Sequence, residues 1–108
     1  MYKVKDTMEL KELEKYGYKL DCENNYYKLY YGQASPKDID YYYDEFKSKY
    51  SYLSEYFCAE IDIQLNKDKT FLIVIYIYSH ESCEVGFNSI DEKFYLQDII
   101  NAGLVDEK

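Results

Sequence analysis

The alternation of apolar and polar residues between Phe57 and Tyr78 predicts two adjacent β-strands. In the first, at residues 57–65, every second side chain is apolar, so one face should be core and the other should meet solvent or a partner. In the second, at residues 70–78, both faces are apolar, which is typical of a central strand. The polar residues 66–69 between them predict a turn.

A second pair of strands is predicted earlier in the chain. Tyr18–Cys22 and Tyr26–Tyr31 flank the short polar segment 23–25, which is the pattern of a β-hairpin. The four tyrosines of the second strand fall on both of its faces, so about half of them must point away from a single-sided core.

Capping patterns predict two helices near the ends of the chain. Asp6 with Glu9 forms a capping-box pattern before a helix at residues 7–16, which Gly17 would end. Ser89 with Glu92 predicts a second capping box, which opens a helix at residues 90–102. Gly103 and Leu104 close that helix in a Schellman-like pattern.

A helix in the middle of the chain is predicted from Ser35 and Pro36, as N-cap and first-turn proline, with Asp38 near the positive end of the helix. Behind them, apolar residues recur at helical spacing: Ile39, Tyr42, Phe46, Tyr50 and Leu53. The resulting order is α-β-β-α-β-β-α. It predicts residues 1–108 to be a single α+β domain, with three helices on an antiparallel sheet of about four strands.

Composition favours a protein that works by surface contact. Sixteen of the 108 residues are tyrosine and none is tryptophan or arginine. Residues with AT-rich codons (Phe, Tyr, Met, Ile, Asn and Lys) together far outnumber Ala, Gly, Arg and Pro, which indicates an AT-rich genome. Codon bias does not explain the tyrosines alone, because Phe and Asn codons are equally AT-rich and each of these two residues occurs only five times. Tyrosine supplies rigid apolar area with a polar tip, as binding surfaces require.

The charge of the chain restricts its partners. The net charge is −8, and residues 38–62 carry seven carboxylates against two lysines. Such a surface repels nucleic acid and anionic membrane and favours basic protein partners.

No stretch is apolar for the ~18 residues that a membrane span requires, and the N-terminus lacks the apolar region of a signal peptide. Three cysteines without close pairing indicate free thiols in a reducing cytoplasm.

The strongest candidate for enzyme chemistry is the segment 79–84, which holds the only histidine. His80 and Cys83 could form a thiol nucleophile with its base, or two ligands of a metal. A structural zinc needs four ligands, however, and we favour the simpler interpretation that the segment is a polar loop leaving the central strand. Phosphate-binding and nucleophile-elbow motifs are absent from the sequence. We therefore predict a protein that is not an enzyme and uses no cofactor or metal.

The strongest candidate for a binding surface is the stretch from 40 to 62, where tyrosines and carboxylates mix. Tyrosine is enriched at binding hot spots, and carboxylates steer a basic partner. The alternative is that the tyrosines lie at the boundary of the core and the acids form a solvated helix face. The predicted partner-binding residues are Asp40, Tyr41, Tyr43, Asp44, Glu45, Tyr52, Tyr56, Glu60 and Asp62.

The two ends of the chain carry a resemblance. Residues 2–18 and 96–105 are similar to the ends of small uncharacterised proteins of phages and prophages in low-GC Firmicutes. This resemblance implies a mobile-element gene in an AT-rich host, and it transfers no functional residue. Small acidic phage proteins without enzyme motifs often inhibit a host protein, and the anti-CRISPR proteins that resemble DNA in charge are one such class.

These observations predict a small acidic protein in the host cytoplasm that blocks a basic, nucleic-acid-binding surface of a host protein, such as a CRISPR effector. Its carboxylates would replace phosphates, and its exposed tyrosines would anchor the contact. It would bind neither nucleic acid nor membrane directly. Two alternatives are a homodimer that pairs through the tyrosine-rich hairpin and a metal or thiol site at His80 and Cys83.

Overall fold

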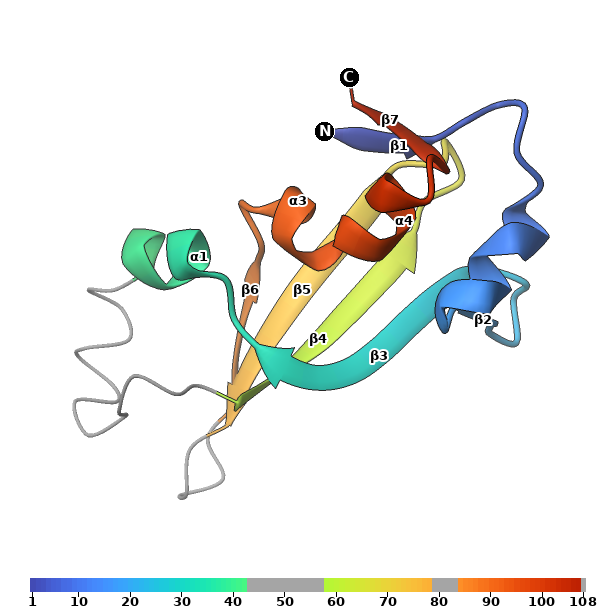
Figure 1. Ribbon diagram of the computed structural model, residues 1–108. Coiled ribbons are helices and arrows are strands. Elements are labelled where there is room, and N and C mark those ends of the chain that lie inside the picture. Colours follow the sequence, from blue (N-terminus) through green and yellow to red (C-terminus); the bar gives the residue numbers. More distant parts are fainter. Residues whose placement is uncertain (43–57, 79–83, 108) are drawn as a thin grey trace.

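A five-stranded antiparallel sheet is the centre of the structure. The computed structural model describes residues 1–42, 58–78 and 84–107. The strands follow one another in sequence order, and each neighbouring pair is antiparallel: β2 (Lys19–Leu20), β3 (Tyr26–Gln33), β4 (Cys58–Leu65), β5 (Phe71–Tyr78) and β6 (Glu84–Asn88). The helices α3 (Glu92–Tyr95) and α4 (Gln97–Asn101) lie across one face of this sheet (Figure 1). The predicted α+β class is therefore confirmed.

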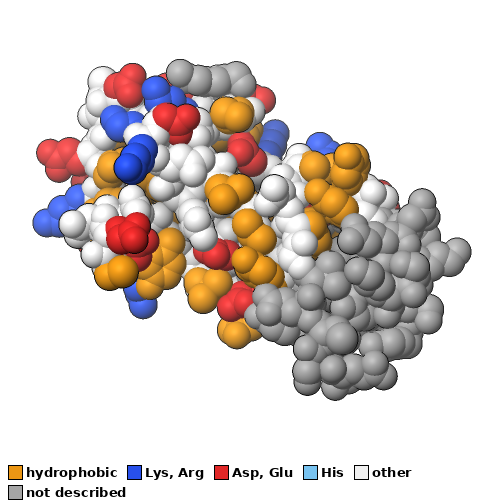
Figure 2. All heavy atoms as spheres, turned by 180° about the vertical axis from the view of Figure 1, so that it is seen from behind, with side chains coloured by type: hydrophobic (Ala, Val, Ile, Leu, Met, Phe, Trp, Pro, Cys, Tyr) orange, Lys and Arg blue, Asp and Glu red, His pale blue; other side chains and the backbone are white. Residues whose placement is uncertain are grey.

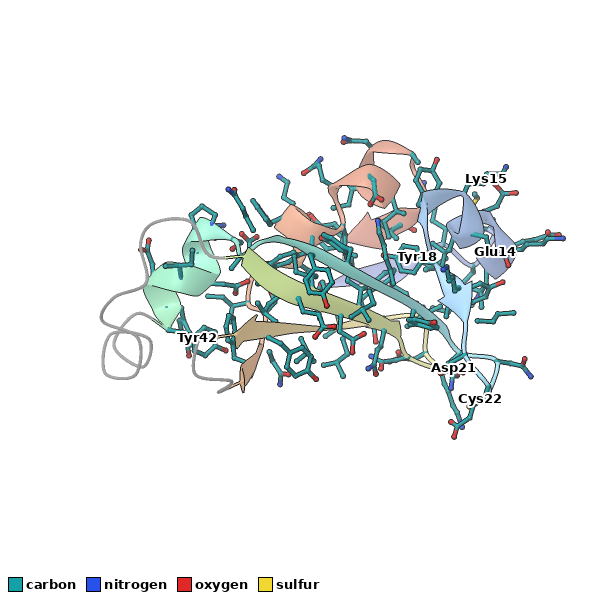
Figure 3. All side chains as sticks on the ribbon, turned by 90° about the horizontal axis from the view of Figure 1, so that it is seen from below. Glu14, Lys15, Tyr18, Asp21, Cys22 and Tyr42 are labelled. Atoms are coloured by element: carbon teal, nitrogen blue, oxygen red, sulfur yellow. The ribbon has the colours of Figure 1, made fainter. Side chains whose placement is uncertain are left out.

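The alternation that predicted β4 and β5 is confirmed by burial. Ala59, Ile61 and Ile63 of β4 are at most 1% exposed and face the helices. Ile73 and Ile75 of β5 face the same side and are at most 3% exposed. β5 lies between β4 and β6, although the middle strand of the five is β4. No helix among the described residues covers the second apolar face of β5, which lies on the opposite side of the sheet (Figure 3).

The predicted hairpin is formed by β2 and β3, with different bounds. β2 has only two residues, whereas β3 continues to Gln33. In the turn, Oδ1 of Asp21 accepts hydrogen bonds from the backbone N–H groups of Glu23 at 2.8 Å and Asn25 at 2.9 Å, and Asn24 adopts φ 62°. An Asx turn that begins at Asp21 thus forms where the sequence predicted the last residues of the first strand.

The first predicted helix is shorter than expected. Residues Leu10–Tyr16 form a 3₁₀ helix, η1, that fully buries only Leu13. The capping box is wrong, because the N–H of Met8 bonds to the carbonyl of Lys5 in a turn that contains Asp6. The end of the helix is as predicted, since Gly17 adopts φ 91°, in the left-handed region.

The last predicted helix is divided into α3 and α4 at Leu96, which is completely buried. Its capping box does not form as predicted. The Ser89 hydroxyl accepts from the N–H of Asp91 at 3.0 Å, not from that of Glu92, and donates its proton to Asp38. The Glu92 carboxylate does not return to Ser89 but accepts from the backbone N–H of Tyr2 at 2.9 Å. The Schellman end is confirmed: Gly103 has φ 74°, and the N–H of Leu104 bonds to the carbonyl of Ile99 at 3.1 Å.

The middle helix begins as predicted. In α1 (Pro36–Tyr41), the hydroxyl of Ser35 accepts from the N–H of Asp38 at 3.1 Å. Asp38, however, is completely buried and does not join the acidic surface. It accepts hydrogen bonds from the Ser89 and Tyr95 hydroxyls, both at 2.8 Å, and thereby fixes α1 to α3 and to the end of β6. The predicted continuation through Phe46, Tyr50 and Leu53 lies outside the described residues.

Three strands were not predicted. β6 is short and contains Gly86, so it carries little strand pattern. β1 (Tyr2–Val4) and β7 (Val105–Glu107) form a separate two-stranded sheet that joins the two ends of the chain (Figure 1). Pairing between segments so far apart in sequence leaves no local signal. Within the described residues, the main sheet has five strands where the sequence predicted about four, because β6 joins it.

Candidate protein-binding face

The face of the sheet opposite α3 and α4 is uncovered by any described helix, and we call it the open face. Its side chains come from alternate positions of four strands, and Figure 2 shows apolar side chains in a band across it, with carboxylates among them. The residues of the open face are Tyr27, Leu29, Tyr31 and Gln33 of β3, Glu60, Asp62 and Gln64 of β4, Leu72, Val74 and Tyr76 of β5, and Gly86 and Asn88 of β6.

A row of carboxylates runs along the middle of the open face. Glu60 and Asp62 lie two positions apart on β4, about 6.8 Å along a strand, and both side chains are half-buried. The amide of Gln64 donates to Oδ2 of Asp62 at 3.1 Å. This hydrogen bond holds the carboxylate along the strand. The twelve residues of the open face include no lysine.

Apolar residues flank the carboxylate row on both sides. Leu29 and Val74 are the cross-strand partners of Asp62, and Tyr31 and Tyr76 are those of Glu60. The exposed fractions are 51% for Leu29, 76% for Tyr31 and 38% for Leu72. Two apolar rows therefore enclose one acidic row, and each carboxylate lies between two hydrophobic surfaces.

Close packing fixes the position of one aromatic ring on this face. A Cβ atom at Gly86 would lie 2.9 Å from Cε1 of Tyr76, so the ring occupies the space above the glycine. Any other residue at position 86 would displace the ring. Gly86 thus lets the apolar row of β5 extend over β6.

A groove continues the open face at one end of the sheet. It has a volume of about 540 Å³ and lies between the β2–β3 turn and the β4–β5 turn. Its lining includes the carboxylates of Asp21, Glu23 and Asp62, together with Tyr27 and Lys67. Figure 3 shows Asp21 and Cys22 at the turn that forms one wall. The acidic row therefore extends from β4 toward this turn.

The structure separates the predicted binding residues into two groups. Glu60 and Asp62 lie on the open face. Asp40 and Tyr41 are exposed on α1. This helix lies beside the β6 edge of the sheet, where the ring centroids of Tyr42 and of Phe87 in β6 are 4.3 Å apart. Five further predicted residues lie outside the described residues: Tyr43, Asp44, Glu45, Tyr52 and Tyr56.

The candidate site also contains residues that the sequence did not single out. Leu29, Leu72 and Val74 join the carboxylates only because strand register places them on adjacent strands. Asp21 belongs to the candidate site because it lines the same groove as Asp62. The alternation of apolar and polar residues in β4 and β5 predicts which of their side chains share a face. The register between β3 and β4 has no such signal in the sequence, because no tight turn connects these two strands.

Tyrosines on the helix-covered side differ in their environment. Burial raises the pKa of Tyr30 to about 12, and it also raises the pKa of Tyr18 and of Tyr95. Lys28, which points to this side, forms an ion pair with Asp98 at 3.1 Å and lies over the rings of Tyr18 and Tyr30. These groups pack the core, and the protons stay on the phenols at neutral pH.

The chemistry available for a metal or nucleophile is limited in the described residues. Within 1–42, 58–78 and 84–107, no three His, Cys, Asp or Glu side chains are placed to hold a metal ion. His80 and Cys83 lie outside these ranges, so the predicted alternative at this pair stays a prediction. Cys22 is an exposed free thiol in the β2–β3 turn.

Comparisons with protein-family models, with curated proteins and with solved structures find no match to this chain. In the described part of the chain, no helix combines the length and apolar character that crossing a membrane requires.

Proposed function

We propose that the protein is an acidic binding protein whose open face docks a basic, partly apolar surface of another protein. The observation that carries this proposal is the acidic row of Glu60 and Asp62 between two apolar rows. A monomeric protein rarely leaves a continuous apolar strip exposed on a sheet, and such strips mark interaction sites.

The two kinds of row supply different parts of the binding free energy. Burial of the exposed Leu29, Tyr31 and Leu72 side chains contributes about 25 cal/mol for each Å² of apolar surface removed from water. The carboxylates contribute steering and specificity, because complementary charge accelerates encounter and rejects acidic surfaces. Lysine and arginine fit this pattern well, since their aliphatic stems pack on apolar rows while their charges reach the carboxylates.

Charge favours a basic protein over the other classes of partner. Nucleic acid and anionic membrane are repelled by a chain with net charge −8. A second copy placed face to face would bring Glu60 and Asp62 against carboxylates of like sign. A basic surface that normally binds nucleic acid has the complementary charge, which supports the predicted role as an inhibitor of such a host protein, CRISPR effectors included.

Two synthetic peptides of equal length and charge test the mode of binding. One is an amphipathic lysine–leucine peptide, and in the other serine replaces every leucine. We expect calorimetry to show clear binding of the first peptide, binding at least tenfold weaker of the second, and loss of affinity with added salt. Equal affinity for both peptides would show that the apolar rows take no part and would contradict the proposal.

The identity of the partner is tested with purified host proteins. A panel of basic nucleic-acid-binding proteins, with CRISPR effectors among them, is assayed for binding to the protein and for displacement of bound nucleic acid. We expect at least one member to bind and to release its nucleic acid in a salt-dependent manner. If no member binds, while the amphipathic peptide does, inhibition of a nucleic-acid-binding protein is wrong and docking of a basic segment stands.

A further inference from the structure

One edge of the sheet is incompletely paired. β2 pairs only with Tyr26 and Tyr27 of β3, whereas β4 pairs with β3 from Tyr27 to Gln33. Among the described residues, 28–33 therefore have a strand on one side alone, and we call their outer side the free edge. In Figure 1, β2 lies beside the first residues of β3 only.

Hydrogen bonding in the hairpin shows which backbone groups point to the free edge. The N–H of Asp21 donates to the carbonyl of Asn25 at 2.9 Å, so these two residues form a hydrogen-bonded pair. Because such pairs alternate along an antiparallel ladder, the odd-numbered residues of β3 direct their N–H and C=O groups toward β2. Beyond β2 these residues are Leu29, Tyr31 and Gln33.

The next ladder gives the same result independently. The N–H of Asn66 donates to the carbonyl of Thr70 at 2.8 Å, which directs the even-numbered residues of β4 toward β5. The odd-numbered residues of β4 are left to bond with the even-numbered residues of β3. In the part of the chain that the structure describes, the three N–H and three C=O groups of the free edge bond to no other backbone group.

The opposite edge of the sheet is covered at its end near Asn88. The N–H of Ser89 donates to the carbonyl of Ile73, so the even-numbered residues of β6 face outward. There the carbonyl of Asn88 accepts a hydrogen bond from the Tyr42 hydroxyl at 2.7 Å, and α1 lies beside the strand. Proteins usually cover or shorten an edge strand in this way. At the free edge of β3, no backbone group of the described residues provides such a partner.

We propose that the free edge pairs with the free edge of a second copy of this chain, antiparallel and about a two-fold axis. In the register that we propose, Tyr31 lies opposite Tyr31 of the second copy, and Leu29 lies opposite Gln33. This register satisfies all three N–H and all three C=O groups of each edge, and it is the only two-fold register that does so.

Charge and chain path favour a second copy as the occupant. Residues 29–33 carry no charge in a chain of net charge −8, so this pairing brings no carboxylate against another. Lys28 points to the helix-covered side, where it pairs with Asp98. β3 ends at Gln33 and the chain turns into α1, so the second copy leaves the edge before it reaches β2.

The pairing would extend the sheet from one copy into the next. The two-fold axis stands perpendicular to the sheet, so both open faces lie on the same side of the dimer. Tyr31 is 76% exposed, and its counterpart would form a cross-strand aromatic pair with it. The proposed docking surface is then doubled, although the pairing itself does not depend on any basic partner.

Disulfide cross-linking tests the register. In a background with Cys22, Cys58 and Cys83 replaced by serine, Tyr31→Cys places two thiols at a separation of about 5.5 Å between Cα atoms, which a disulfide can bridge. Leu29→Cys alone is the matched control, because the two copies of residue 29 are four positions out of register. A mixture of Leu29→Cys and Gln33→Cys chains should cross-link only as the heterodimer.

Proline substitution tests the free edge without a cysteine. Tyr31→Pro removes an N–H that faces outward, so the chain should keep its fold, whereas Tyr30→Pro removes a bond to β4 and should unfold it. Light scattering of the unmodified protein should give twice the mass of one chain, and Tyr31→Pro should give one. A single-chain mass at millimolar concentration, or cross-linking of Leu29→Cys as strong as that of Tyr31→Cys, would overturn the proposal.

Discussion

The two faces of β4 differ in what they do, although they belong to the same eight residues. On one face, Ala59, Ile61 and Ile63 are at most 1% exposed beneath α3 and α4. On the other, Glu60 and Asp62 are half-buried among apolar side chains, and no described helix lies over them. The difference separates residues that hold the fold together from residues that we propose contact a partner. The predictions below test that separation.

The largest effect is expected from a large-to-small change on the covered face. Ile61→Ala leaves a cavity beneath the helices and should lower the free energy of unfolding by about 4 kcal/mol. Leu72→Ala on the open face should lower it by less than about 1 kcal/mol, because its side chain already meets water. Urea denaturation measures both. Equal losses would show that the open face is covered in solution.

A second contrast concerns two carboxylates on α1. Asp38→Asn replaces a buried acceptor, and its amide would face the donors of Ser89, Ile90 or Tyr95, so we expect a loss of about 3 kcal/mol. Asp40→Asn, on the exposed side of the same helix, should leave stability within about 0.5 kcal/mol. If Asp38→Asn is equally mild, the network that fixes α1 contributes little.

The hydroxyls of two buried tyrosines should have opposite effects. Tyr95→Phe removes the donor to Asp38 and the acceptor for the N–H of Ser35, so stability should fall by about 2 kcal/mol. The hydroxyl of Tyr18 is buried and forms no hydrogen bond within the described chain, so Tyr18→Phe should raise stability by up to about 1 kcal/mol. Thermal unfolding of the two variants measures the difference directly.

Alkaline pH should weaken the covered face. Burial raises the pKa values of Tyr18, Tyr30 and Tyr95 above the ordinary value of 10.0, with that of Tyr30 at about 12. Above pH 10 the unfolded chain therefore loses protons that the folded chain retains, so stability falls as the pH rises. Below pH 10 these groups contribute their full stabilisation. Denaturation series from pH 8 to 12 should show a decline that begins near pH 10. A flat profile across this range would contradict the burial of these phenols.

The sequence predicted those parts of the fold whose signals are local. Alternation located β4 and β5, and left-handed glycines ended two helical segments at Gly17 and Gly103. Ser35 and Pro36 likewise began α1 as expected. Each of these signals depends on neighbours within a few residues, and tertiary contacts did not override it.

The predictions that failed involve hydrogen bonds that compete with the predicted pattern. At Asp6 the competing bond is local, in the turn from Lys5 to Met8, whereas Ser89 donates to the carboxylate of Asp38, far away in the chain. In the candidate site, alternation alone identified Glu60 and Asp62. The apolar rows beside them required the register of β3 against β4, which is set by tertiary packing without a turn pattern.

The role of the open face as a docking surface is tested most directly by neutralising its acidic row. Glu60→Gln with Asp62→Asn should leave the free energy of unfolding within about 0.5 kcal/mol and weaken binding of the amphipathic lysine–leucine peptide about tenfold, at ~0.7 kcal/mol for each ion pair. Glu9→Gln with Glu14→Gln removes the same charge from exposed positions of the 3₁₀-helix segment and should leave the affinity within about twofold. If both double substitutions weaken binding of the peptide equally, the loss of affinity is due to net charge alone. That result would contradict a docking site on the open face.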